Sequence, residues 1–189
     1  MPSSAIRRPP SDNAVNGGGL DVSPVLRLGL FIAVVVLVVD QVSKWWIVEV
    51  VMRPPRIIEV TPFFNLVMGW NRGVSFGFFS DAPEWTAWLL PLVALVIVGV
   101  LLVWLARSDR RLIGVAIGLI VGGAVGNLVD RARYGAVADF LDVHAWGYHW
   151  PAFNAADSAI TVGAVALVLD SLFVRPERPK NEEGGDVNR

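Results

Sequence analysis

Carboxylate and amide side chains gather in one stretch of the chain, from Val121 to Ile160. The stretch lies between two strongly apolar segments and contains Asn127, Asp130, Arg131, Asp139, Asp142, Asn154 and Asp157. Ionisable groups at the edge of the hydrocarbon are costly to keep, which makes them candidates for function. Two neighbouring carboxylates cannot both ionise easily, so one can act as a base while the other carries a proton. The stretch therefore favours acid–base chemistry by a pair of aspartates.

Other chemistries fit the sequence less well. His144 and His149 are the only histidines and cysteine is absent, so they make a poor zinc set, and the HExxH pattern does not occur. Ser75 and Ser158 have no evident basic partner, and no GxSxG or GxxxxGK[ST] motif is present. We therefore expect no metal and no cofactor.

Each candidate residue also has a purely structural interpretation. Asn154 is a plausible N-cap, which places Asp157 in the first turn of a helix, where an acidic residue is a common cap. Asp139 follows the glycine turn of YGAVADF and could end a short strand. Asp130 and Arg131 are typical of a salt-bridged helix end. For Asp157 the pattern alone leaves capping and catalysis equally open.

The composition is typical of a membrane protein. The 189 residues are 54% hydrophobic and 17% charged, with a mean hydropathy of +0.54, well above an ordinary soluble domain. The formal net charge of -1 provides no basic surface for nucleic acid. Most of the eight Trp residues lie near the ends of apolar runs, where an aromatic belt is expected.

Four apolar segments are long enough to span a bilayer. We expect one membrane domain over residues 25–174, with spans at about 25–48, 87–106, 112–129 and 158–174 and loops at 49–85 and 130–157. The polar segments 1–24 and 175–189 are expected to be disordered tails. The first apolar run continues through DQVSKWW without a small-residue cleavage site, which favours an uncleaved span over a signal peptide.

Smaller patterns refine this picture. Asp40 and Lys44 are four residues apart and share a helix face, either as a structural ion pair or as support for a polar site. Glycine recurs at 114, 118, 122 and 126, a small-residue ridge that lets another helix approach closely. In the loop 49–85, IIEVTPFFNLVMGW predicts short strands interrupted by Pro62.

Basic residues predict the orientation in the membrane. Ten Lys and Arg residues lie in the segment up to Arg27, in 107–111 and after the fourth span, whereas the longer loops 49–85 and 130–157 hold five. Cytoplasmic segments carry the excess of positive charge. We therefore expect both termini in the cytoplasm and the polar stretch on the opposite side.

Five motifs together resemble the bacterial lipoprotein signal peptidase family, signal peptidase II. They are VDQVSKWW around Asp40, NRGVSFG from Asn71, GGAVGNLVDR from Gly122, VADF around Asp139 and PAFNAADSAI from Pro151. They cover all four expected spans and come in the family's order. One such motif would be weak, but five in order are specific.

The resemblance implies an all-α membrane protein of four transmembrane helices with a small extracytoplasmic β-rich lobe and a short interfacial helix. It implies an aspartic endopeptidase of the bacterial inner membrane, with Asp139 and Asp157 as the catalytic dyad. Residues that match other motif positions and support the site are Asp40, Lys44, Asn71, Gly73, Asn127, Asp130, Arg131 and Asn154. The implied substrate is a prolipoprotein, cut just before its diacylglyceryl-modified cysteine. We expect a monomer in the lipid bilayer.

Two rival functions belong to other classes. A small ion-coupled transporter could use Asp40, Lys44 and Asp130 as a relay, but it would favour ionisable groups near mid-membrane and a repeat between the halves. The acids instead cluster at one end of the spans, and the halves do not match. A non-enzymatic scaffold would suit the glycine ridge but does not require Asp139 and Asp157 to be close.

Overall fold

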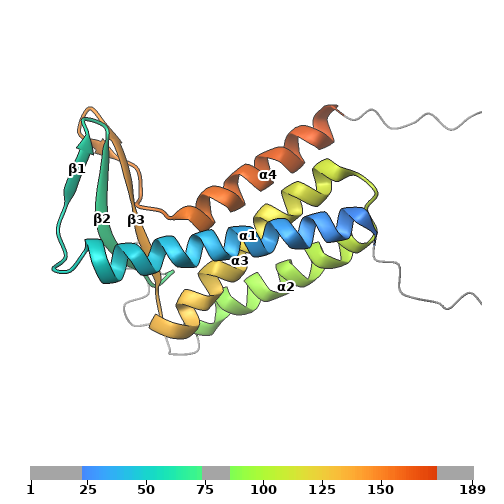
Figure 1. Cartoon of the computed structure of the whole chain (residues 1–189), viewed down its shortest axis with the longest axis horizontal. Coiled ribbons are helices and arrows are strands. Elements are labelled where there is room, and N and C mark those ends of the chain that lie inside the picture. The colour runs from blue at the N-terminus through green and yellow to red at the C-terminus, as the bar shows by residue number, and fades with distance from the viewer. Residues whose placement is uncertain (1–22, 74–85, 174–189) are drawn as a thin grey trace, which may run out of the picture.

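Four long helices form the body of the molecule in a computed structural model that describes residues 23–73 and 86–173. They are α1 (Pro24–Trp46), continued by the π-helical turn η1 (Ile47–Val51), α2 (Thr86–Ala106), α3 (Arg111–Tyr134) and α4 (Ala155–Phe173). All are long and apolar enough to cross a membrane. Figure 1 shows them packed lengthwise against one another. The expected four-span architecture is confirmed.

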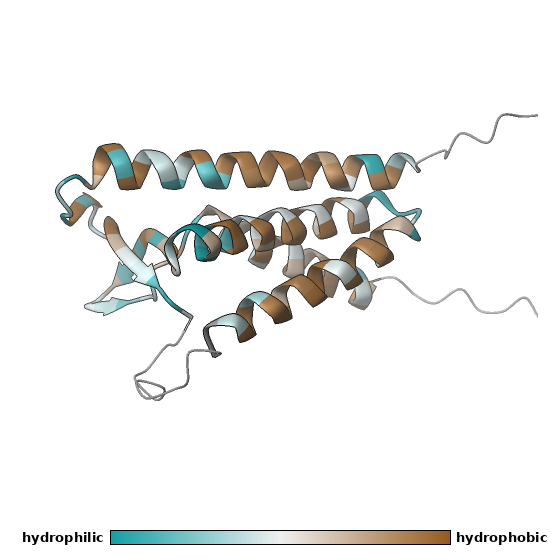
Figure 2. Cartoon of the chain, turned by 90° about the horizontal axis from the view of Figure 1, so that it is seen from below, coloured by the Kyte–Doolittle hydropathy of each residue, from teal (hydrophilic) through white to brown (hydrophobic). Residues whose placement is uncertain are grey.

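The apolar side chains point outward along the bundle. Phe31 on α1, Val100 on α2 and Leu172 on α4 are 67%, 62% and 71% exposed. In Figure 2 hydrophobic residues dominate the length of the helices, and hydrophilic residues gather toward their ends and in the sheet. A soluble protein does not expose so continuous an apolar surface, so these faces lie against lipid.

The third helix is the centre of the bundle. Over half of its most apolar window, 56%, is buried, against 11% to 17% for the other three. Its glycine ridge explains this: a β-carbon on Gly118 would lie 2.5 Å from the carbonyl oxygen of Gly29, and one on Gly122 equally close to that of Ala33. The backbone of α1 therefore occupies the ridge, and the prediction that it serves packing is confirmed.

A small antiparallel sheet sits at one end of the bundle (Figure 1). Its strands are β1 (Ile58–Thr61), β2 (Phe64–Asn71), β3 (Val137–Ala145) and β4 (Tyr148–His149), in the order β1-β2-β3-β4. The strands predicted on either side of Pro62 are thus present. Because β2 precedes α2 and β3 follows α3, their pairing joins two loops that are distant in sequence into one lobe.

Two helix ends differ from the expected spans. The third helix continues past Val129 to Tyr134 and ends at Gly135, whose φ of +68° is the left-handed cap that glycine favours. Asp130 and Arg131 therefore lie on the last turns of α3 rather than in a loop. The fourth helix starts at Ala155 instead of Ser158, because Asn154 caps it. Hydropathy alone made both spans too short, because charged residues lower the hydropathy of the last turns of α3 and the first turn of α4.

Two further expectations concern the loop 49–85 and the terminal segments. Between residues 49 and 73, helical structure is confined to the end of η1. The remainder of that loop, 74–85, lies outside the described residues, as do residues 1–22 and 174–189, so the expected interfacial helix and disordered tails are not among the described features.

Candidate active site

A buried lysine lies at the centre of the polar groups near the sheet. Lys44 Nζ is 2.9 Å from Asp40 Oδ2 and 2.8 Å from Asp130 Oδ2, and the three side chains are only 5%, 0% and 2% exposed. An unpaired charge in such buried surroundings would strongly destabilise the fold, so the lysine and the two carboxylates neutralise one another. Asp40 and Lys44 do share a helix face, and that face meets α3.

Backbone and amide donors complete this ion cluster. The N–H of Ala156 donates to Asp40 at 3.0 Å, and the N–H of Ala138 donates to Asp130 at 3.2 Å. Through these two bonds the cluster is tied to the start of α4 and to β3. The last ridge glycine, Gly126, leaves room for Asp40, because a β-carbon there would overlap its carboxylate.

Gln41 is a further member of the cluster; it lies in the VDQVSKWW motif but was not selected as a site residue. Its Nε2 lies 3.1 Å from Asp40 Oδ2 and 3.0 Å from Asp130 Oδ1, and it also donates to the carbonyl of Gly126 at 3.2 Å. The side chain therefore bridges α1 and α3. Its position three residues before Lys44 places it near Lys44 on the helix surface, and this spacing could have suggested a role in the site.

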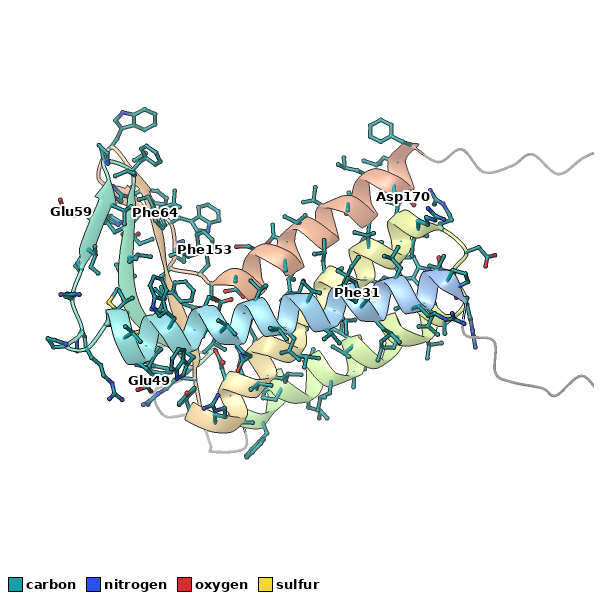
Figure 3. The ribbon with its side chains drawn as sticks, in the orientation of Figure 1. Phe31, Glu49, Glu59, Phe64, Phe153 and Asp170 are labelled. Atoms are coloured by element: carbon teal, nitrogen blue, oxygen red, sulfur yellow. The ribbon has the colours of Figure 1, made fainter. Side chains whose placement is uncertain are left out.

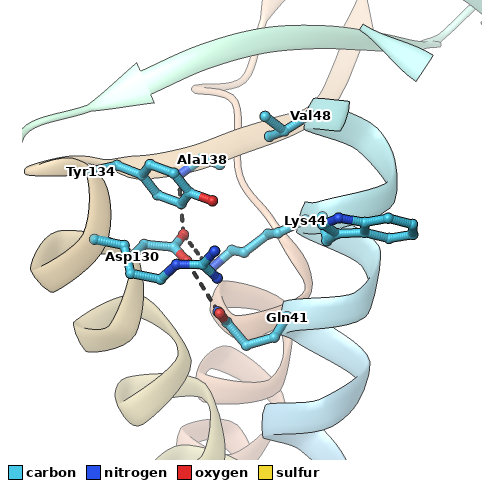
Figure 4. A pocket seen from close by; sticks show the side chains of 8 residues that line it. Gln41, Lys44, Val48, Asp130, Tyr134 and Ala138 are labelled. Carbon is cyan, nitrogen blue, oxygen red and sulfur yellow. Dashed lines mark hydrogen bonds and ion pairs between the residues drawn. The ribbon is translucent and has the colours of Figure 1, made fainter. Parts of the chain in front are cut away.

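Figure 4 shows Gln41, Lys44 and Asp130 of this cluster beside a cavity of about 10 Å³ between α1 and α3. Gln41, Lys44 and Asp130 line its polar side, and Trp45 and Tyr134 line its apolar side. That volume suits about one water molecule. Neither Asp139 nor Asp157 lines it, so the cavity is separate from the candidate dyad.

Asn127 connects the ion cluster to Asp157. Its Oδ1 accepts a hydrogen bond from Lys44 Nζ at 2.9 Å, and its Nδ2 donates to Asp157 Oδ1 at 2.8 Å. The lysine thus fixes the amide orientation, since an ammonium group can only donate. The amide then presents its N–H₂ group to the carboxylate.

Asp157 and Asn154 cap α4 reciprocally. The N–H of Asp157 donates to Asn154 Oδ1 at 3.0 Å, and the N–H of Asn154 donates to Asp157 Oδ2 at 3.2 Å. This is the reciprocal arrangement of a capping box. The predicted N-cap is therefore present. Capping engages Asp157 Oδ2, while Oδ1 faces Asn127, so a capping role and a chemical role are compatible in this one residue.

Asn154 also reaches the second carboxylate of the site. Its Nδ2 donates to Asp139 Oδ1 at 2.7 Å and lies 3.3 Å from Asn127 Oδ1. Asp139 lies on β3, opposite Gly69 of β2, and is 3% exposed. Asp139 of β3 and Asp157 of α4 therefore contact two amides that neighbour each other, although 18 positions separate the aspartates in sequence.

The surroundings of Asp139 favour its protonated form. Burial raises the pKa of Asp139 above its ordinary value, and the nearby charge of Asp157 acts in the same direction. Polar contacts with the side chains of Asn71 and Asn154, and the charge of Lys44, oppose the rise without cancelling it. Asp139 is therefore suited to carry a proton at a pH where an exposed aspartate is ionised.

The remaining predicted residues surround this arrangement. Asn71 ends β2, and its Oδ1 accepts a hydrogen bond from the N–H of Gly73 at 2.8 Å, where φ is +78°. A side chain at Gly73 would overlap Leu90 at the start of α2. Arg131 Nη1 lies 3.4 Å from the carbonyl oxygen of Asn127. All ten residues selected from the sequence therefore lie in or beside one site.

A second polar cluster lies on the lobe. His149 Nδ1 is 2.9 Å from both carboxylate oxygens of Asp142, and Asn65 Nδ2 donates to Asp142 Oδ2 at 3.0 Å. Burial alone would raise the pKa of Asp142, but the contacts with His149 and Asn65 outweigh it and lower the pKa. His144 stacks on His149 with ring centroids 4.7 Å apart. Within residues 23–73 and 86–173, no group of three His, Asp or Glu side chains is arranged to hold a metal ion.

Four spans, a small sheet and a cluster of buried carboxylates at one end of the helices define a multi-pass membrane protein. The family model for signal peptidase (SPase) II matches residues 32–173. The chain belongs to the signal peptidase II family, membrane aspartic peptidases that process bacterial lipoproteins.

Individual relatives agree with this assignment. A lipoprotein signal peptidase of Methylorubrum extorquens is 45% identical over 163 residues, covering 85% of this chain and 94% of the relative. One from Pseudoalteromonas atlantica is 46% identical over 143 residues, covering 75% and 87%. Two solved structures of bacterial membrane enzymes superpose with TM-scores of 0.65 and 0.68 at 31% and 32% identity, covering 85% and 78% of this chain and 94% of each structure.

Proposed function

We propose that Asp139 and Asp157 form a catalytic dyad that hydrolyses the peptide bond before the diacylglyceryl-modified cysteine of a prolipoprotein. The observation that carries the proposal is the linked pair of amides, Asn127 and Asn154, which hold the two carboxylates toward one another. A helix cap alone would not need a second, buried carboxylate at this place. An ion cluster alone would not need the amides.

The different surroundings of the two carboxylates suggest different roles. Asp157 accepts hydrogen bonds from Asn127 and from the backbone of Asn154, and it serves as the base that takes a proton from an attacking water. The oxygen of that water forms a bond to the scissile carbonyl carbon. Asp139, whose pKa is raised, is the protonated partner and donates a hydrogen bond to the developing oxyanion.

Collapse of the tetrahedral intermediate completes the reaction. The carbonyl reforms, the carbon–nitrogen bond breaks, and Asp139 gives its proton to the departing amine of the modified cysteine. The proton that Asp157 took from water then passes within the dyad, so the starting protonation is restored. The lysine cluster takes no proton in this scheme and fixes Asn127.

The location of the dyad suits a lipid-modified substrate. It lies where the sheet meets the ends of α3 and α4, so acyl chains could remain in the bilayer while the peptide bond enters the site. On the distribution of basic residues, we propose that both termini are cytoplasmic and that the dyad is at the extracytoplasmic face of the inner membrane. One chain supplies both carboxylates, so we propose a monomeric enzyme with residues 25–174 as its peptidase domain.

The decisive experiment compares purified wild type with Asp139→Asn and Asp157→Asn on a lipidated prolipoprotein. Near-isosteric amides keep the shape but cannot exchange the proton. Wild type should cleave before the modified cysteine, and both variants should fold and show no cleavage above background. Asp142→Asn, outside the proposed dyad, is the matched carboxylate control and should still cleave. Wild-type rates in both dyad variants would refute the aspartic mechanism.

A further inference from the structure

The β3–β4 hairpin has one polar face and one apolar face. His144 pairs with His149, and Ala145 pairs with Tyr148. Because side chains alternate along a strand, the two histidines share a face with Asp142, which contacts His149. The opposite face carries Val143, Tyr148 and Trp150, which are 41%, 69% and 61% exposed. We call these three residues, together with Trp146 at the turn, the aromatic hairpin face.

The turn of the hairpin has an unusual residue at its tip. Trp146 and Gly147 have φ values of +49° and +80°, as a two-residue type I′ turn requires. Asn, Asp or Gly normally fills the first of these positions, because a bulky side chain is disfavoured at positive φ. Trp146 is nevertheless there and is 104% exposed. No contact within the described chain explains a large aromatic side chain at this strained position.

The aromatic hairpin face is directed toward the helices. Along β3 it continues through Leu141 to Asp139, which contacts Asn154 at the start of α4. Leu141 also exchanges backbone hydrogen bonds with Phe153, at 2.8 and 3.0 Å. In Figure 3 Phe153 lies between the sheet and α4, and the strands extend sideways beyond the helix start. The outer part of this face therefore overhangs the lipid that surrounds α4.

Other aromatic residues mark the membrane boundary at the same end of the bundle. Trp45 and Trp46 near the end of α1 are 57% and 53% exposed, and Trp88 at the start of α2 is 74% exposed. Tryptophan and tyrosine concentrate at the headgroup level, where one part of the ring system is in apolar surroundings and the polar atom is hydrated. The hairpin thus continues a belt that the spans already define.

We propose that the aromatic hairpin face inserts into the interfacial layer of the bilayer and anchors the lobe there, with Trp146, Tyr148 and Trp150 among the lipid headgroups. The opposite face, where Asp142 contacts His149 and Asn65 and where His149 and Glu59 are exposed, stays outside the lipid. Such an anchor fixes the height of β3, and therefore of Asp139, relative to the membrane surface. The occupant is the bilayer itself and not a protein partner.

The absence of cysteine makes the test direct. Single cysteines are introduced by Tyr148→Cys and Trp150→Cys, and Glu59→Cys is the control, because Glu59 is exposed on β1 opposite Asn65 of the polar face. Each is spin-labelled and reconstituted in phosphatidylethanolamine–phosphatidylglycerol bilayers. Collisions with oxygen, which partitions into lipid, are compared with collisions with a water-soluble nickel chelate.

Labels at 148 and 150 should show an oxygen-to-nickel accessibility ratio several-fold higher than the label at 59, without any substrate. Equal ratios at the three positions would place the hairpin in water and overturn the proposal. A lipid-like ratio that develops only after a lipidated prolipoprotein is added would also overturn it, because the face would then bind substrate. Using two positions guards against one label disturbing the hairpin.

Discussion

The side chains of Asn127 and Asn154 lie 3.3 Å apart, Nδ2 of Asn154 to Oδ1 of Asn127, and each donates to a different carboxylate of the proposed dyad. Asn127 Oδ1 also accepts from Lys44 Nζ at 2.9 Å. One oxygen therefore receives both donors, and the orientation of the two amides is set by a buried charge. A positioning role for Asn127 follows from this geometry.

Asn127→Ala should reduce kcat with little change in KM. Removing one hydrogen bond to a charged group corresponds to roughly 10- to 100-fold in rate, and the loss affects the reacting carboxylate rather than substrate affinity. Steady-state cleavage of a lipidated peptide measures both constants. Asn127→Asp, which keeps the size but removes the donor to Asp157, should not restore kcat. An unchanged kcat in the alanine variant would exclude the role.

Lys44→Met should destabilise the protein by about 3–5 kcal/mol, the usual cost of leaving a buried charge unpaired. Two carboxylates, Asp40 and Asp130, would lose their shared cation. Unfolding by a denaturing detergent from mild micelles is a suitable measurement. Adding Asp130→Asn should recover part of the loss by removing one of the unpaired charges; failure to recover any would contradict the proposed coupling.

Asp139→Asn should stabilise the protein at neutral pH, by about 0.5–2 kcal/mol, as other stabilising changes at costly functional positions do. The pKa of Asp139 is raised by burial from 3.8. Its favourable contribution is therefore complete below 3.8 and is lost as pH rises through the raised pKa. The thermal unfolding temperatures of variant and wild type should therefore diverge as the pH is raised from acid to neutral. Parallel curves would show that Asp139 is not strained by its charge.

Asp142→Asn should have the opposite pH dependence. Its pKa is lowered by the contacts with His149 and Asn65, so its contribution is present above the ordinary value of 3.8 and is lost as pH falls through the lowered pKa. We expect wild type to be more stable than the variant at pH 7 by about 1 kcal/mol, typical of a partly exposed charged hydrogen bond. The difference should disappear in strong acid, and a difference that grows there would be contrary to this account.

Gly122→Ala should destabilise the bundle, whereas Gly99→Ala should not. A β-carbon at Gly122 would lie 2.5 Å from the carbonyl oxygen of Ala33, while one at Gly99 meets nothing within 4 Å. Overpacking costs about 1–3 kcal/mol, and alanine is the better helix former by roughly 1 kcal/mol where space allows. Detergent unfolding of the two variants compares the same chemical change in different surroundings.

The spans, the strands around Pro62 and the cap at Asn154 could be predicted because each depends on local pattern. Hydropathy, β-branched residues and capping preferences act over a few residues. The motif order also led to the family and to the ten residues now found around one site. Helix ends near charged residues were less predictable: α3 keeps Asp130 in a helical turn because its partners, Lys44 and the N–H of Ala138, lie on other elements.

Contacts between distant segments could not be inferred from the sequence. In the sequence, Gln41 looks like any other polar residue of a helix. Only the packing of α3 against α1 shows that it bridges Asp40 and Asp130. The contact of Asp142 with Asn65 could not be predicted either, because β2 and β3 are far apart in the chain and their register includes a shift between Leu66 and Gly69. The two faces of the β3–β4 hairpin could likewise not be assigned until the position of its turn, and therefore its strand pairing, was known.

The contacts that the start of α4 makes with the first helix have a consequence for the biosynthesis of the protein. The last helix and its N-cap contribute Asp157 and Asn154, and the N–H of Ala156 completes the hydrogen bonds of Asp40 on the first helix. A nascent chain that has inserted three helices therefore has half of the carboxylate pair and an incompletely bonded Asp40. Proteolytic competence would arise only when synthesis has reached the final span. With the proposed dyad, the order of the elements along the chain thus delays peptidase activity until the last helix has been made.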